Sequence, residues 1–104
     1  MAQYTGNYSW MVGKFSSVME KHEELGKSLR EAGPISHKDG HLIQLGAAAA
    51  NRSEGAVHSH TKRALAAGAT EEEIYHALIL LTSTLGFPPV AAAISWAREI
   101  IEGQ

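Results

Sequence analysis

The stretch that decides the fold is residues 53–74, which read SEGAVHSHTKRALAAGATEEEI. Ser53 is a typical helix N-cap, because its hydroxyl can accept a hydrogen bond from the first turn, and Gly68 suits the position just past a helix end. Thr70 and Glu73 have the spacing of a capping box. We therefore predict one helix after Ser53 and a second helix after Thr70.

The residues just before this stretch predict a partner for the first of these helices. Ser36 is another N-cap candidate, and Asp39 favours the first turn of the helix that follows. The break at Asn51-Arg52 is short. Helices over residues 36–50 and 53–67 should therefore pack against each other as a central hairpin.

The two ends of the chain also carry apolar residues at helical spacing. Residues 8–32 should form one long helix or two short ones, which end at Gly33-Pro34. The last amphipathic helix should follow Gly86-Phe87-Pro88-Pro89 and extend to about Ile101. No segment alternates between apolar and polar residues with a period of two, so the sequence predicts an all-α fold.

The helix after Thr70 has an apolar stripe that extends from Ile74 to Leu85. Ile79 and Leu80 widen this stripe, so we expect the helix to be buried on two sides. With no repeat or linker in the sequence, the prediction is a single domain over residues 1–104 with about five or six helices.

Composition and charge narrow the classes of function. The 104 residues include no cysteine, which excludes disulfides, zinc–thiolate sites and thiol redox chemistry. The net charge is −2 without a basic stripe, so nucleic acid is not an expected partner. Residues 1–7 lack the apolar core of a signal peptide, and the longest apolar stretch is too short to span a bilayer. We expect a cytoplasmic protein without membrane contact, and the many small alanines favour self-association.

Histidine is the residue type that stands out for chemistry, with six in the chain. Near neutral pH a histidine can act as an acid, a base or a metal ligand. His60 shares a helix face with Val57 and Ala64 that should point to the core, where its ring nitrogens need partners. His41 lies on the preceding helix, so the hairpin can bring His41 and His60 together. A purely structural role remains an alternative for His60.

The other histidines have simpler interpretations. His22 and His37 lie near helix edges and should be solvated. His76 is one residue from a buried stripe and should occupy a hydrogen-bonded core or interface position. His58 points about 200° away from His60 around the helix, so these two cannot chelate one ion.

A metal held by His41, His60 and a carboxylate is a further alternative. Glu54 offers a carboxylate, but its direction differs from that of His60 by about 120°. We therefore predict no metal and no cofactor. Of the nearby basic residues, Arg52 can hold a substrate carboxylate, whereas Lys62 and Arg63 suit a solvated face.

The string from His60 to Ile74 resembles the carboxymuconolactone decarboxylase family, which also contains the alkyl hydroperoxidase D-type peroxidases. In that family a helix with C-x-x-C-x-x-x-H is followed by A-L-x-A-G-A-T and E-E-I. Residues 42–48 resemble its E-L-I-x-L-A-x-A helix, and Gly86-Phe87-Pro88 resembles its G-[FY]-P segment. The resemblance covers about residues 10–102. It implies an alkyl hydroperoxidase D-like helical fold and assembly into homo-trimers or homo-hexamers.

The same resemblance implies an altered active site. The family histidine falls on His60, its two redox cysteines on Ser53 and Ala56, and its glutamate on His41. Serine and alanine cannot form a disulfide, so peroxidase chemistry through thiols is excluded. The decarboxylase branch acts on a small carboxylated lactone, where the negative charge left by CO2 spreads into a carbonyl and a histidine can supply a proton.

We therefore expect a lyase-type acid–base enzyme, a decarboxylase or an enzyme for lactones or keto-acids, that acts on a small carboxylated compound. His60 and His41 are the predicted catalytic residues. Ser53 can hydrogen-bond substrate, although an N-cap role competes, and His58 and Arg52 are predicted to contact substrate. The alternative is a non-catalytic oligomeric protein that binds a ligand or metal at an altered family site.

Overall fold

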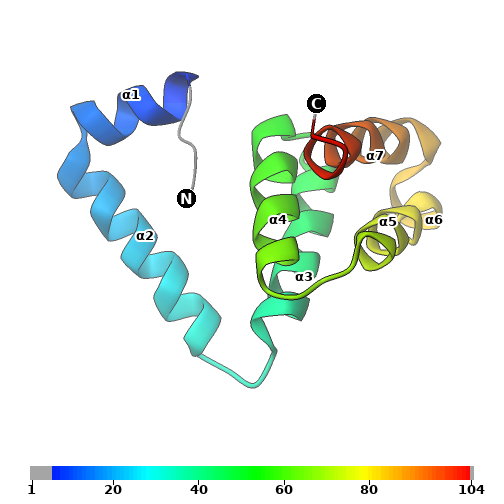
Figure 1. Cartoon of the computed structure of the whole chain (residues 1–104), viewed down its shortest axis with the longest axis horizontal. Coiled ribbons are helices and arrows are strands. Elements are labelled where there is room, and N and C mark those ends of the chain that lie inside the picture. The colour runs from blue at the N-terminus through cyan, green and yellow to red at the C-terminus, as the bar shows by residue number, and fades with distance from the viewer. Residues whose placement is uncertain (1–5, 104) are drawn as a thin grey trace. The chain divides into compact units, whose positions relative to one another are not determined.

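The computed structural model describes residues 6–103, and every regular element in that range is a helix (Figure 1). Six helices have nine residues or more, and α6 is a single turn of four residues. The all-α prediction is therefore confirmed. The polar residues 1–5, which entered the signal-peptide argument, lie outside the described range. The elements are α1 (Gly6–Lys14), α2 (Ser16–Glu31), α3 (His37–Ala50), α4 (Glu54–Ala66), α5 (Glu71–Ile79), α6 (Thr82–Leu85) and α7 (Phe87–Ile101).

The helices fall into two compact units, which divide between Pro34 and Ile35. The first unit contains α1 and α2, so the region predicted as one long or two short helices is two. They separate at Phe15, whose φ of −124° and ψ of 51° lie outside the helical region. Met19 is the buried hydrophobic residue of this unit, which therefore has little core of its own.

The second unit is built on the predicted hairpin. α3 packs along α4, α7 packs against α4, and α5 packs against α3 and α7 (Figure 1). Its largest fully buried side chains come from all four of these helices. Among residues 6–103, half of the buried hydrophobic residues, six of twelve, are alanine, which lets helices approach closely but removes little apolar area from water. The largest buried apolar side chains are Leu45, Val57, Ile74, Leu78 and Val90.

Local capping places the helix ends of this unit where the sequence predicts them. The Ser36 hydroxyl accepts a hydrogen bond from the Asp39 backbone N–H at 3.1 Å, at the start of α3. The Thr70 hydroxyl accepts from the Glu73 N–H at 3.0 Å, and the Glu73 carboxylate accepts from the Thr70 N–H at 2.9 Å. This reciprocal pair confirms the capping box of α5. Gly68, with φ of +102°, follows the end of α4, in a conformation that favours glycine.

Replacing Thr70 with alanine is expected to lower the free energy of unfolding by about 1 kcal/mol, because the first turn of α5 loses its cap. Thr70→Ser keeps the hydroxyl and is the matched control. Urea unfolding of the two variants measures the difference, and equal losses in both would contradict the capping role.

Glu73 adds a dependence on pH to the same cap. The hydrogen bond from the Thr70 backbone, and then the one from Lys38 at 3.1 Å, lower the pKa of Glu73. A carboxylate whose pKa is lowered by folding stabilises the protein above its unfolded pKa, and this contribution is lost as the pH falls through the folded value. The loss of stability caused by Glu73→Gln should therefore be larger at about pH 7 than at about pH 3. Urea midpoints at the two pH values test this.

The predicted helix over residues 74–85 is interrupted, and one of its faces is open. α5 ends at Ile79, where the carbonyl accepts a hydrogen bond from the Thr82 hydroxyl at 2.8 Å, and α6 begins at Thr82. Ile74 is fully buried, but Ile79 and Leu80 are 49% and 62% exposed. The prediction of burial on two sides is wrong for the single chain, because α3 and α7 pack against one face and no described element of this unit covers the other.

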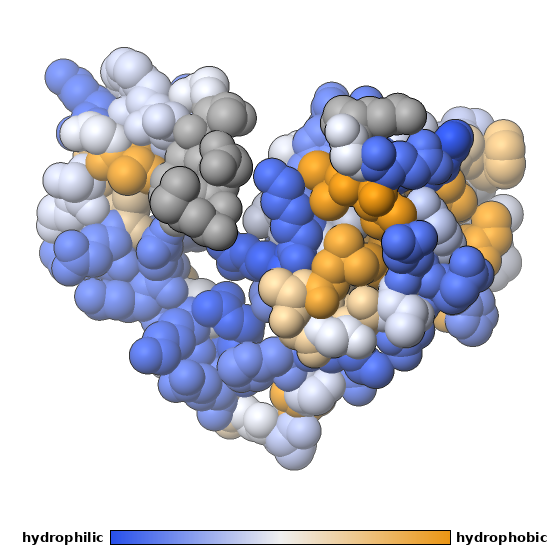
Figure 2. Space-filling model, viewed as in Figure 1, coloured by the Kyte–Doolittle hydropathy of each residue, from blue (hydrophilic) through white to orange (hydrophobic). Residues whose placement is uncertain are grey.

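Large apolar side chains are exposed in both units, and Figure 2 shows apolar surface among hydrophilic surface in each of them. In the first unit, many of the apolar residues at helical spacing within residues 8–32 are exposed, so no other element of that unit packs against them. Across residues 6–103, no helix has both the length and the apolar character needed to cross a membrane. The exposed large apolar residues are Trp10, Phe15, Val18, Leu25, Leu29, Ile35, Ile43, Ile79, Leu80 and Phe87.

Candidate histidine site on the central hairpin

The hairpin brings His41 of α3 and His60 of α4 together. Their Nδ1 atoms are 3.4 Å apart, and the ring centroids are 5.6 Å apart with an angle of 36° between the ring planes. His41 is 5% exposed, whereas His60 is half-buried. The predicted approach of the two rings is confirmed, and His60 is the member of the pair that solvent or a ligand can reach more easily.

The facing nitrogens restrict the protonation states of this pair. A neutral imidazole has one N–H donor and one acceptor nitrogen, so a hydrogen bond between the two Nδ1 atoms requires one ring to carry its proton on Nδ1 and the other to leave Nδ1 unprotonated. Two imidazolium rings would present N–H to N–H and repel each other. The contact therefore favours states in which the facing nitrogens share a single proton. Such a pair can act as a proton donor or as a proton acceptor.

His60 lies at the edge of the buried face of α4 rather than at its centre. Val57, Thr61 and Ala64 are fully buried and form the centre of that face. The expectation that His60 itself points into the core is therefore only partly met. Thr61 holds the central position instead, although its hydroxyl has no hydrogen-bond partner among the described residues. An imidazole at the edge of an apolar face can contact both solvent and a buried partner.

Ser53 and Arg52 lie at the turn of the hairpin, away from the histidine pair. The Ser53 hydroxyl accepts a hydrogen bond from the Ala56 N–H at 3.3 Å, as an N-cap does. Arg52 is exposed and has φ of +53°, which is uncommon for a residue with a Cβ. Helical rise places Ser53 about 10 Å from His60 along α4. A single small functional group of a substrate therefore cannot contact both Ser53 and His60.

His58 faces α7 instead of His41. Its Nε2 is 2.8 Å from Oε1 of Glu99, so this pair joins α4 to α7. Glu54 lies one turn before His58, and ligand atoms of Glu54, His58 and Glu99 all lie within 4.8 Å of one another. Sequence reasoning compared Glu54 with His60 and missed this cluster. The four-residue spacing between Glu54 and His58 was a usable signal, but Glu99 required the packing of α7.

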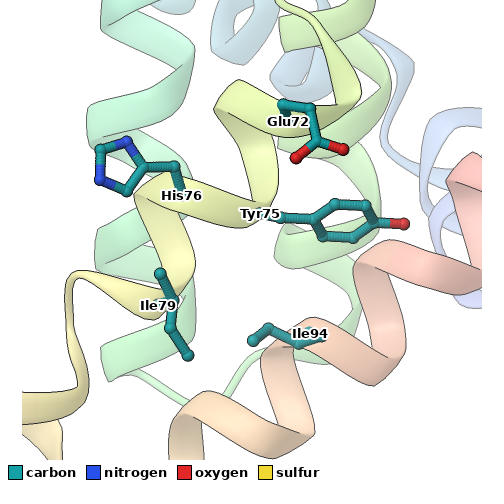
Figure 3. A pocket seen from close by; sticks show the side chains of 5 residues that line it. All are labelled: Glu72, Tyr75, His76, Ile79 and Ile94. Carbon is teal, nitrogen blue, oxygen red and sulfur yellow. The ribbon is translucent and has the colours of Figure 1, made fainter.

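A separate open depression of about 500 Å³ lies between α5 and α7 (Figure 3). Glu72, Tyr75, His76, Ile79 and Ile94 line it. Burial, followed by the negative charges of nearby glutamates, raises the pKa of Tyr75. In the figure the His76 ring points away from Tyr75, to the other side of α5. Neither member of the histidine pair lines this depression.

The remaining histidines are all exposed. His22 and His37 are solvated, as predicted. His76 is also exposed, so a core position is wrong for it, whereas the interface position that was predicted as its alternative stays a prediction. The reason is that His76 lies outside the face of α5 that Ile74 and Leu78 bury.

Comparison with known protein families identifies the family to which this sequence belongs. The family model described as carboxymuconolactone decarboxylase family matches residues 17–99. The match includes α3, α4 and both members of the histidine pair. Searches of the curated proteins and of the solved structures find no match.

Proposed function

Because the chain belongs to the carboxymuconolactone decarboxylase family, we propose that it is a cysteine-free acid–base enzyme acting on a small carboxylated compound. The reaction is a decarboxylation or a related conversion of a lactone or keto-acid. The observation that carries this proposal is the 3.4 Å contact between the Nδ1 atoms of His41 and His60. The family match spans both compact units, which supports treating residues 1–104 as one domain, and the cysteine-free composition is compatible with the cytoplasm.

The different exposure of the two rings supports a different role for each of them in this proposal. His60 is half-buried and contacts the substrate, whereas His41 is 5% exposed and exchanges a proton with His60 from behind. When the bond to the carboxylate carbon breaks, its electron pair moves toward the adjacent carbonyl and CO2 leaves. The His60 imidazolium then donates a proton to the resulting enolate, and His41 stabilises the neutral His60 that remains by exchanging a proton with it.

The turn residues and His58 have smaller roles in this proposal. Arg52 and Ser53 lie about 10 Å from His60 along the helix, so they contact only the far end of an extended substrate. Arg52 can then hold a second carboxylate by a charge-assisted hydrogen bond. Nε2 of His58 contacts Glu99 at 2.8 Å, so His58 can contact substrate through Nδ1 while it keeps this partner.

A non-catalytic ligand-binding protein is the second candidate function. The observation that favours it is the open depression lined by Tyr75, Ile79 and Ile94, which combines apolar walls with a few polar groups. The histidine pair does not line this depression. A ligand held there would bind without contacting the proposed catalytic groups.

The experiment that tests the proposed function is a screen of small carboxylated lactones and keto-acids for CO2 release and substrate loss. The proposal predicts turnover that saturates with at least one member of the panel. Saturable binding without turnover, together with protection of Tyr75 rather than His60 from chemical modification, would favour the ligand-binding alternative.

We also predict that the protein has no dithiol-driven peroxidase activity, because a serine and an alanine occupy the two family cysteine positions. Serine hydroxyls are not ionised at neutral pH and form no disulfide. Hydroperoxide consumption in the presence of a dithiol should equal that of the reaction without protein. A reproducible, protein-dependent rate in metal-free buffer would contradict this prediction.

We propose that the protein assembles as a homo-trimer or homo-hexamer, supported by the uncovered apolar side chains of both units. Leu80→Glu should shift the assembly to single chains of 11.2 kDa without unfolding them. The reason is that Leu80 is 62% exposed, so the new carboxylate would lie in water in the single chain. Sedimentation measures the size of the assembly, and circular dichroism measures the helix content. Ser95→Glu places the same charge at another exposed position and should leave the assembly intact. A wild-type protein that sediments as one chain at micromolar concentration would refute the proposal.

A further inference from the structure

We infer that Glu54, His58 and Glu99 form a binding site for a divalent transition-metal ion on the side of α4 that faces α7. This inference does not depend on the proposed acid–base reaction, and its residues are separate from the histidine pair. We call these three residues the α4–α7 site.

The backbone already places the three ligands together. Glu54 and His58 are four residues apart on α4, so they project from the same side of the helix one turn apart. Glu99 approaches from α7, which packs against α4. The imidazole and the Glu99 carboxylate are 2.8 Å apart, and one ligand atom from each residue lies within 4.8 Å of the others.

These separations are close to those that a metal ion requires. Bond lengths of about 2.0–2.2 Å to nitrogen and oxygen correspond to ligand–ligand distances of about 3.3–3.6 Å in a tetrahedral site. Because all three ligand atoms lie within 4.8 Å of one another, no separation has to shorten by more than about 1.5 Å. Glu54 is exposed, so rotation of its side chain can supply this movement without disturbing the core.

The charge of the site also favours a divalent cation. Two carboxylates and a neutral imidazole carry a formal charge of −2. Within residues 6–103, Lys38 pairs with Glu73 and Arg98 pairs with Glu102, and no lysine or arginine pairs with Glu54 or Glu99. A hydrogen bond between His58 and Glu99 explains two of the three residues, but it does not explain why the Glu54 carboxylate lies beside them.

The donor set selects the class of ion. Carboxylate oxygens alone suit Mg²⁺ and Ca²⁺, whereas the imidazole nitrogen shifts the preference toward Zn²⁺ and neighbouring transition metals. Three protein ligands leave at least one position for water, and the half-buried His58 and Glu99 remain within reach of solvent. A bound ion would link α4 to α7 and would occupy His58, so His58 would then be a ligand rather than a substrate contact.

The test is calorimetric titration of metal-free protein with Zn²⁺, repeated with Mg²⁺. We expect wild type to bind about one more Zn²⁺ per chain than His58→Asn, and Glu54→Gln and Glu99→Gln to weaken that step by at least about tenfold. Glu99→Gln keeps the shape and an acceptor oxygen for His58, so it isolates the charge. His37→Asn and Glu71→Gln change an exposed histidine and an exposed glutamate outside the site, and should match wild type.

Zn²⁺ ions that other histidines bind contribute equally to wild type and to His58→Asn, so they cancel in the difference between the two stoichiometries. His60→Ala should retain the step, which separates the α4–α7 site from the histidine pair. As a second readout, Co²⁺ should give visible ligand-field absorption in wild type that is lost in His58→Asn. Zn²⁺ should also raise the melting temperature of wild type by several degrees, and that of Glu99→Gln by less at the same Zn²⁺ concentration. Equal stoichiometry and affinity in wild type and all three site variants would overturn the inference.

Discussion

Replacing His60 with alanine is expected to lower kcat/KM by about 10²–10⁴-fold, the usual contribution of a positioned general acid or base. His60 is the half-buried member of the pair, so its loss removes the group that contacts substrate in the proposed reaction. Far-UV circular dichroism should show that most helicity remains, because the centre of the buried face of α4 is formed by Val57, Thr61 and Ala64.

Two further variants separate a catalytic from a structural role for His60. His60→Asn keeps a polar side chain but cannot titrate between about pH 5 and 8, so it should be nearly as inactive as His60→Ala. His37→Ala removes an exposed histidine from the start of α3 and should keep wild-type turnover. If both His60 variants lower the melting temperature and leave turnover unchanged, His60 has only a structural role.

Replacing Leu45 with alanine is expected to lower the free energy of unfolding by about 2–5 kcal/mol, because it leaves a cavity in a fully buried part of the core. The effect should be large for this protein, since alanine supplies half of the buried hydrophobic residues and few large side chains hold the second unit together. The urea midpoint at a fixed protein concentration measures the loss.

Ile43→Ala is the matched control for this core prediction. Ile43 lies on the same helix, two residues before Leu45, but is 59% exposed. Its replacement should change the free energy of unfolding by no more than about 0.5 kcal/mol. A loss at Ile43 as large as that at Leu45 would contradict the packing of α3 described here.

Short-range signals in the sequence predict the helix ends well. Ser36, Ser53 and the Thr70–Glu73 pair each act within a few residues, so their hydrogen bonds depend little on the rest of the chain. The short break at Asn51-Arg52 similarly leaves a hairpin as the simplest arrangement. The approach of His41 to His60 follows from that hairpin, which is why sequence alone could anticipate it.

Features that depend on packing between distant elements were missed or wrong. The apolar stripe continues in phase from α5 into α6, so its spacing gave no sign of the break between Ile79 and Thr82. Burial of Ile79 and Leu80 was inferred from their apolar character, but an apolar residue is buried only if another element covers it. Glu99 approaches His58 from 41 residues away along the chain, and no local pattern reports such a contact.

The most direct test of the central claim is the pH dependence of kcat/KM for wild type and His41→Ala, with a substrate from the CO2-release screen. Because the proposed reaction uses a proton that the facing nitrogens share, the kcat/KM of wild type should depend on at least one group that titrates between about pH 5 and 8, the range in which histidine usually changes its charge. Removal of His41 should shift or simplify that profile, since His60 then loses the nitrogen 3.4 Å from its own Nδ1. A profile that is flat across this range in wild type, or identical in the two proteins, would contradict the proposal that the histidine pair performs acid–base chemistry.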